Sequence, residues 1–341
     1  MALTLTSAEP ARVRWIDALR GFIMILMVFG HVWAGIKNAG ILKSGPVFEM
    51  TYSWIYFFHM PTLFVLSGML YSEPSYGRGL ITENTRRVFR FLYPLVLWSY
   101  VYYTFKFIFA DMVNTPVTLV EVLLGPLPPK DHFWFLWALF LIQLGASLLL
   151  AIFARLPGGR NNYAFGIVGL VIAVAMFYLP GIRTAWTAPA IGMAAFFFFG
   201  VLLSRFRLAN MPINTASATI GLAVFAAVPT IIVAAGLQEL DLISVALQCF
   251  CILGLIAFAI WVSGRLGDNP AFGFLCKAGQ ASMAIYLLHL FFASGVRILL
   301  QQLEIDDPPP HIAMGMLLGV LVPMAIHFSV NRPWLRKLLG I

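Results

Sequence analysis

The chain has 341 residues, of which 61% are hydrophobic and only 11% are charged. Soluble domains carry about 25% charged residues, so this composition excludes a soluble globular enzyme and a disordered chain. The net charge of +8 does not by itself indicate nucleic acid, because membrane proteins concentrate Lys and Arg in their cytoplasmic loops. We therefore expect membrane lipids, and no nucleic acid, as partners.

Ten apolar segments follow one another along the chain, each near the roughly 20 residues that a helical membrane span needs. They are residues 15–36, 48–71, 88–110, 132–154, 162–180, 184–204, 215–235, 241–263, 278–300 and 312–331. No soluble domain is left between them. The sequence therefore predicts an all-α polytopic membrane protein, with a single transmembrane domain over residues 1–341 and a short cytoplasmic N-terminal segment, 1–14.

The basic residues separate the two sides of this arrangement. If the N-terminus is cytoplasmic, most Lys and Arg residues fall in the inner loops and helix ends, as the positive-inside rule expects. The basic residues left on the outer side are Lys37, Lys43, Lys106, Lys130, Arg183 and Arg297. This bias predicts that both termini are cytoplasmic.

The first predicted span carries two ionisable residues on one helix face. Arg20 and His31 are eleven residues apart, which brings them within about 20° of the same direction and about 16 Å apart along the axis. Ionisable groups at such depth are costly and often mark function. A snorkelling arginine and a hydrogen-bonded core histidine explain the same spacing equally well.

Two further histidines fall near mid-depth, His59 in the second span and His289 in the ninth. With His31 they could line one cavity. No acidic residue or cysteine accompanies them at that depth, so we expect no metal. Pro61 and Gly68 in the second span favour a kink and close approach of another helix, respectively. We interpret His327 as structural, and His132 and His311 as interfacial.

The densest basic cluster follows the second span. Arg86, Arg87 and Arg90 lie within five positions, and arginine forks bind phosphate in a bidentate manner. A ligand phosphate and anionic lipid headgroups both remain possible partners. Trp134, at the start of the fourth span, suits either an interfacial aromatic belt or a stacking contact with a sugar.

Together these residues resemble the acyltransferase-3 family of multipass membrane acyltransferases, and they are closest to sugar O-acetylases that have no added extracytoplasmic domain. The matching motifs, in chain order, are residues 14–21 with His31, residues 60–68, Arg86 with Arg87 and Arg90, residues 134–136, and Gly279 with Ser282 and residues 286–289. Residues 331–333 depart from the pattern, because Asn331 stands where relatives often have an acidic residue.

The resemblance implies a ten-helix domain in the bacterial inner membrane. Such a protein takes an acyl group, usually acetyl, from cytosolic acyl-CoA. It transfers the group to a hydroxyl of a glycan or glycolipid, and acetyl-CoA would be the donor here. The alternatives are a multipass transporter or flippase of a glycolipid or small polar solute, and a membrane-embedded binding or assembly subunit.

For the acyltransferase we expect His31 to deprotonate the acceptor hydroxyl or to carry the acyl group transiently. Arg20 would orient the donor, and His59 or Ser67 would polarise the carbonyl or orient His31. The remaining expected site residues fall into two groups. Arg14, Arg86, Arg87 and Arg90 would bind the CoA phosphates, and Trp134, Tyr286 and His289 would contact the substrate.

Overall fold

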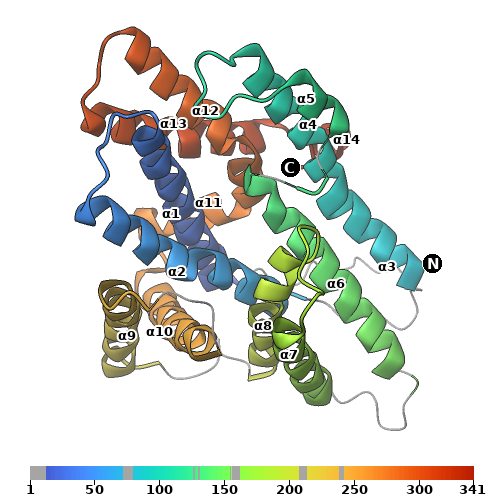
Figure 1. Cartoon of the computed structure of the whole chain (residues 1–341). Helices are drawn as coiled ribbons and strands as arrows, with labels where there is room; N and C mark the ends of the chain where they lie inside the picture. The colour runs from blue at the N-terminus through green and yellow to red at the C-terminus, as the bar shows by residue number, and fades with distance from the viewer. Residues whose placement is uncertain are drawn as a thin grey trace, which may run out of the picture.

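The computed structural model describes residues 13–71, 80–125, 127–129, 131–153, 155, 162–206, 213–237 and 242–341. Residues 1–12 of the predicted N-terminal segment and the predicted outer Lys130 lie outside these ranges. The elements in chain order are α1 (Arg14–Asn38), α2 (Pro46–Met69), α3 (Leu80–Arg87), η1 (Val88–Leu92), α4 (Tyr93–Ile108), α5 (Leu119–Leu124), η2 (Asp131–Phe133), α6 (Trp134–Phe153), α7 (Asn162–Tyr178), α8 (Ala188–Leu203), η3 (Ser204–Phe206), α9 (Thr215–Ala234), α10 (Leu242–Leu266), α11 (Pro270–Gln280), α12 (Ser282–Gln302), α13 (Pro308–Ser329) and α14 (Pro333–Leu339). The described part of the chain contains helices and no strand (Figure 1).

Each of the ten predicted spans coincides with one of these helices. Seven helices are long and apolar enough to cross a membrane, namely α1, α6 with η2, α8 with η3, α9, α10, α12 and α13. The other three, α2, α4 and α7, are less apolar or shorter. The protein is therefore an all-α polytopic membrane protein, as predicted, while the count of ten and the side of the termini stay predictions. The helices α3, α5, α11 and α14 were not foreseen.

Helix α1 is central to the arrangement, because it packs against α2, α10, α11, α12 and α13. Its tightest neighbour is α11, and two glycines account for this. A Cβ added at Gly21 would collide with the backbone of Leu275, and one added at Gly279 would collide with the backbone of Asp17. The two helix backbones therefore touch where side chains would otherwise separate them.

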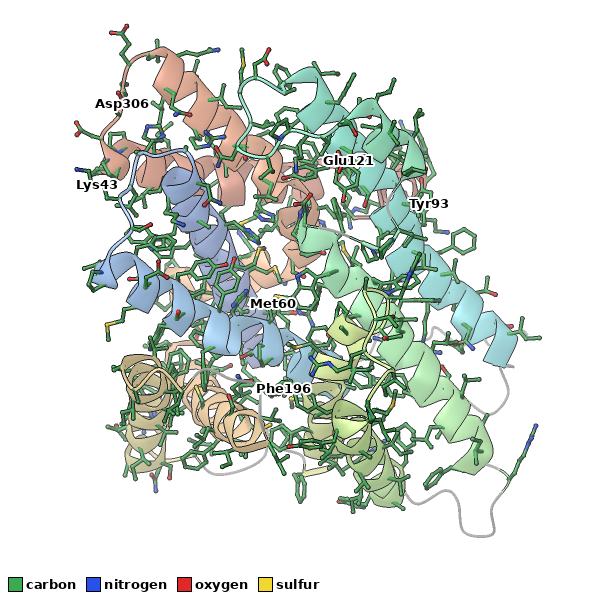
Figure 2. The ribbon with its side chains drawn as sticks, in the orientation of Figure 1. Lys43, Met60, Tyr93, Glu121, Phe196 and Asp306 are labelled. Atoms are coloured by element: carbon green, nitrogen blue, oxygen red, sulfur yellow. The ribbon has the colours of Figure 1, made fainter. Side chains whose placement is uncertain are left out.

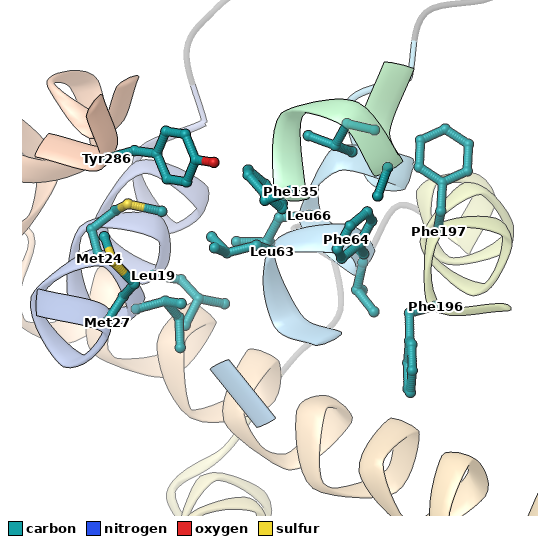
Figure 3. Close-up of a cluster of buried hydrophobic side chains, with 14 of the residues drawn as sticks. Leu19, Met24, Met27, Leu63, Phe64, Leu66, Phe135, Phe196, Phe197 and Tyr286 are labelled. Atoms are coloured by element: carbon teal, nitrogen blue, oxygen red, sulfur yellow. The ribbon is translucent and has the colours of Figure 1, made fainter. Parts of the chain in front are cut away.

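Helix α2 packs against α8 in the same way, through Gly68 and Gly200. A Cβ at Gly68 would overlap the carbonyl of Phe197, and one at Gly200 would overlap that of Val65. The prediction that Gly68 permits close approach of another helix is confirmed. Beside this contact, Phe64 and Phe197 lie in the hydrophobic core (Figure 3).

Contacts between distant segments define two ends of the bundle. At one end, Asn114 donates to the carbonyl of Gly35 at 2.9 Å, and the loops that carry Lys43 and Asp306 lie toward the same end in Figure 2. At the other end, Arg14 donates to the carbonyl of Gly267. By the predicted topology the first end is extracytoplasmic and the second is cytoplasmic.

Candidate active site

Three histidine rings from three separate helical segments lie together inside the bundle. His31 comes from α1, His132 from η2 and His289 from α12. The ring centroids of His31 and His289 are 5.0 Å apart, those of His132 and His289 5.5 Å, and those of His31 and His132 6.4 Å. We call these three residues the histidine cluster.

The three rings differ in access and in partners. His289 is 0% exposed and His132 is 5% exposed, whereas His31 is only half-buried. Within the described residues, His31 makes no hydrogen bond. His31 is therefore the most accessible ring of the cluster, and its nitrogens are open to a substrate.

The hydrogen bonds of His289 determine which of its ring nitrogens carries the proton in the neutral form. Its Nδ1 lies 2.9 Å from the carbonyl oxygens of both Ile285 and Tyr286. Carbonyl oxygens only accept, so Nδ1 carries the proton and the neutral ring keeps a lone pair on Nε2. Among the described residues Nε2 has no hydrogen-bond partner. His289 therefore offers the cluster an acceptor, which suits it to orient a neighbouring imidazole that donates.

His132 is a member of the site that the sequence did not suggest. We expected it at the membrane interface, whereas it is buried in the cluster and neither of its ring nitrogens has a hydrogen-bond partner in the described structure. The hydroxyl of Tyr286 donates to the His132 carbonyl at 2.5 Å. This bond joins α12 to η2, so Tyr286 positions His132. The side chain of Tyr286 is seen beside Phe135 in Figure 3.

His59 stands apart from the other three rings. Its Nδ1 donates to the carbonyl of Ile55 at 2.8 Å, and its ring packs edge-on against Tyr56, with the centroids 4.6 Å apart. No ring contact joins it to another histidine within the described residues, although it lies within electrostatic range of His31. Of the three histidines predicted to line one cavity, only His31 and His289 have rings in contact, and the cavity stays a prediction.

The other predicted residues around the cluster have local partners. Arg20 faces Asp17 at 3.8 Å on α1, which is one unbroken helix over both Arg20 and His31. The hydroxyl of Ser67 donates to the carbonyl of Leu63 at 2.7 Å. Trp134 is half-buried and stacks on Phe64 with centroids 6.2 Å apart.

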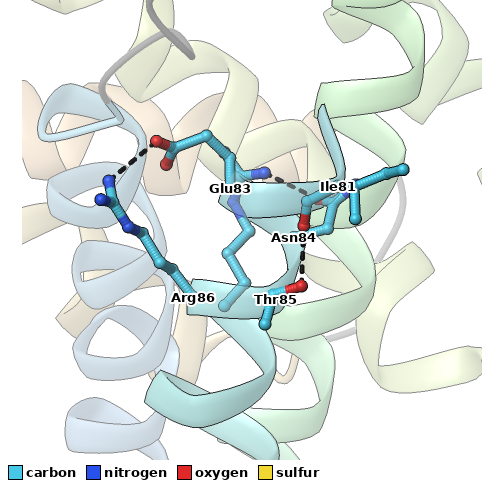
Figure 4. A network of polar contacts seen from close by, with 6 residues as sticks. Ile81, Glu83, Asn84, Thr85 and Arg86 are labelled. Carbon is cyan, nitrogen blue, oxygen red and sulfur yellow. Dashed lines mark hydrogen bonds and ion pairs between the residues drawn. The ribbon is translucent and has the colours of Figure 1, made fainter. Parts of the chain in front are cut away.

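The predicted phosphate-binding arginines lie on α3 and η1. Arg86 is exposed and pairs with Glu83 at 3.0 Å (Figure 4), and Arg90 is also exposed. Arg87 is buried, and it donates to Asn84 Oδ1 at 2.8 Å and to Ser147 Oγ at 2.6 Å. Arg87 therefore ties α3 to α6, while its two neighbours keep their guanidinium groups at the surface.

Arg14 lies at the start of α1, where its guanidinium binds the Gly267 carbonyl and lies 5.5 Å from the centroid of the Phe272 ring. It is exposed and thus open to an anionic ligand at this end. No group of His, Cys, Asp or Glu residues suitable for a metal ion occurs in the described ranges.

Comparison with known proteins agrees with this architecture. The model of the acyltransferase domain family Acyl_transf_3 matches residues 13–328. The nodulation protein NolL of Mesorhizobium japonicum is 25% identical over 131 residues, which cover 37% of this chain and 32% of that protein. The NolL of Sinorhizobium fredii is 28% identical over 144 residues, covering 40% and 36%. The matched region thus spans only about a third of these relatives.

No solved structure matches the chain. The family match nevertheless covers nearly the whole described chain, from the start of α1 almost to the end of α13, and it includes all three residues of the histidine cluster. The chain therefore belongs to the acyltransferase-3 family and is a multi-pass membrane protein.

Proposed function

We propose that this protein is an O-acetyltransferase of the bacterial inner membrane. It moves the acetyl group of cytosolic acetyl-CoA to a hydroxyl of a cell-surface glycan or of its lipid-linked precursor. The observation that carries the proposal is the imidazole of His31, half-buried and free of intramolecular hydrogen bonds among the described residues, beside His289 in a chain of this family.

The chemistry assigned to His31 is general base catalysis. Its neutral ring takes the proton of the acceptor hydroxyl while the hydroxyl oxygen attacks the thioester carbonyl. The new C–O bond forms and the C–S bond breaks. The departing CoA thiolate then accepts the proton from the imidazolium. His289, with its Nε2 lone pair in the cluster, orients His31 as a positioning residue. Transient transfer of the acetyl group to His31 is the second form of the same proposal.

The donor would enter from the cytoplasmic end. Its phosphates would bind the exposed guanidinium groups of Arg86, Arg90 and Arg14. The buried Arg87 would add positive charge from the interior, and its hydrogen bonds would hold α3 against α6. The pantetheine arm would then extend between the helices toward His31, past Arg20. Trp134 and His59 would complete the surroundings of the acceptor and the thioester.

The experiment is acetyl transfer from radiolabelled acetyl-CoA in membranes that contain the full chain. We expect His31→Gln to lower the rate by roughly 10²- to 10⁴-fold, because general base catalysis contributes that much. His327→Gln removes an imidazole outside the cluster and should leave the rate near that of the wild type. Full transfer by His31→Gln would refute the assignment.

The donor is tested separately by thermal stability. Acetyl-CoA should raise the unfolding temperature of the purified protein more than 3′-dephospho-CoA does, and added salt should reduce the difference. Equal stabilisation by both compounds would exclude a role for the arginines in recognising the 3′-phosphate. Mass spectrometry of surface glycans from a deletion strain would then identify the acceptor, as the sugar that loses an acetyl increment.

A further inference from the structure

Two buried cations lie on helices that also contact or contribute to the histidine cluster, and the catalytic proposal uses neither of them. Lys106 on α4 is 5% exposed and Arg297 on α12 is 6% exposed. Both belong to the few basic residues that the predicted topology places on the extracytoplasmic side, where the positive-inside rule disfavours them. A charge kept at a buried and topologically unfavourable position requires a reason specific to that position.

The side chains paired with Lys106 and Arg297 carry less charge than these two cations do. Lys106 Nζ pairs with Asp131 at 3.4 Å, and the side chain of Asp131 is 34% exposed. Arg297 donates to the side-chain amide of Gln301 at 2.7 Å, which is a neutral partner. No carboxylate of the described residues forms an ion pair with Arg297. A buried guanidinium with only a neutral partner carries an uncompensated desolvation cost.

The two cations converge on one aromatic residue, Tyr102. Lys106 Nζ lies 5.5 Å from the centroid of the Tyr102 ring, and Arg297 lies within electrostatic range of the Tyr102 hydroxyl. The Tyr102 ring also packs edge-on against His132, with the centroids 5.3 Å apart. The cationic pair and the histidine cluster are therefore neighbours, joined through Tyr102.

A second observation indicates a ligand at this place. Both ring nitrogens of His132 are buried without a hydrogen-bond partner in the described part of the chain, although buried polar groups are nearly always satisfied. Helix α4 supplies Lys106 and Tyr102, η2 supplies Asp131 and His132, and α12 supplies Arg297. Three separate segments thus place positive charge and unused hydrogen-bonding groups around Tyr102.

We propose that Lys106 and Arg297 form a binding site for an anionic group carried by the acceptor, so that the acetylated molecule is an acidic sugar or a sugar on a phosphate-linked carrier. This inference rests on the proposed function, because it names the class of acceptor. The anion would compensate the charge of Arg297, and its attachment would set the distance between the reacting hydroxyl and His31.

The test measures binding, so that it does not require turnover. The probes are methyl glucuronide, its neutral counterpart methyl glucoside, and dodecyl phosphate, each added to the purified full chain at equal ionic strength. We expect an anionic probe to raise the unfolding temperature and methyl glucoside not to. A shift with methyl glucuronide assigns the site to a sugar carboxylate, and a shift with dodecyl phosphate alone assigns it to a carrier phosphate.

Two variants connect that shift to the two cations. Arg297→Gln removes one charge, and the double variant Lys106→Gln with Asp131→Asn removes the ion pair while leaving groups that can hydrogen-bond to each other. Each should reduce affinity for the anionic probe by about tenfold, since a charge-assisted hydrogen bond is lost, and Arg297→Lys should recover part of it. Stabilisation by acetyl-CoA should be unchanged in all three variants, which shows that they are folded.

The outcomes that overturn the inference are specific. They are equal stabilisation by methyl glucoside and methyl glucuronide, no stabilisation by either anion, and full retention of the shift in both variants. Loss of acetyl-CoA stabilisation in the wild type would instead count against the proposed function, and it would leave the anion-binding result to stand by itself.

Discussion

The two polar regions of this protein are built in opposite ways. The histidine cluster takes its rings from α1, η2 and α12, which are distant in sequence, and two of its three members are fully buried. The arginine segment on α3 and η1 is one short stretch, and its exposed members make local contacts, Arg86 with Glu83 and Arg90 with the ring of Phe91. Tertiary packing therefore creates the first region, whereas local sequence alone creates the second.

This difference teaches how each region should respond to change. A ring in the cluster has fixed neighbours and a fixed depth, so replacing one group alters geometry that nothing else can restore. In the proposed donor site, an exposed arginine would be one of several flexible cations around the phosphates, and its neighbours could substitute for it. Arg87 is the exception within the arginine segment, because its hydrogen bonds to Asn84 and Ser147 make it part of the packed interior.

The largest effect after that of His31 is expected at His289. In His289→Asn the amide nitrogen can still donate to the carbonyls of Ile285 and Tyr286, while the acceptor at Nε2 is lost. We expect transfer to fall by roughly 10²-fold with an unchanged KM for acetyl-CoA, because the base loses its orientation but the donor site is intact. His289→Gln, which restores a polar group near Nε2, should recover part of the rate. An unchanged rate in His289→Asn would remove His289 from the mechanism.

The second prediction concerns Arg87 and separates it from the rest of its segment. Arg87→Gln leaves Ser147 and Asn84 without their charged donor, so it should lower the free energy of unfolding by about 1–3 kcal/mol. Denaturant unfolding of the purified protein measures this loss, and Arg86→Gln is the matched control that should show almost none. Equal stability of the two variants would mean that the buried network contributes nothing.

The sequence was sufficient for the helices, while the roles of the predicted site residues stay predictions. Hydropathy alone located α1 and the nine other long segments, since bilayer thickness fixes their length. It also placed Arg20 and His31 on one helix, and it gave Gly68 its packing role. The boundary near residue 278 was wrong, because α11 ends at Gln280 and α12 begins at Ser282. The short amphipathic helix and the span after it have no polar gap between them.

What the sequence could not provide is which helices are neighbours. Position along a span gives depth in the membrane, but it does not say which helix face meets which. His132 was therefore assigned to the interface from its place at the start of a span, although the fold brings it against His289. His59 has a similar predicted depth, yet its ring contacts Tyr56. Long-range packing decides both outcomes, and no local pattern encodes it.

The smallest effect is predicted for Arg86, which is exposed and differs most from the buried residues of the histidine cluster. Arg86→Gln should raise the KM for acetyl-CoA by about two- to fivefold at low salt, because an exposed ion contact contributes little and the exposed Arg90 remains in the same segment. The change should vanish at high salt, while kcat and stability stay the same. Arg183→Gln is the control, since Arg183 is also exposed but lies on the predicted opposite side. A loss of kcat in Arg86→Gln would contradict this assignment. It would place an exposed, locally paired arginine in the chemistry that we assign to the histidine cluster.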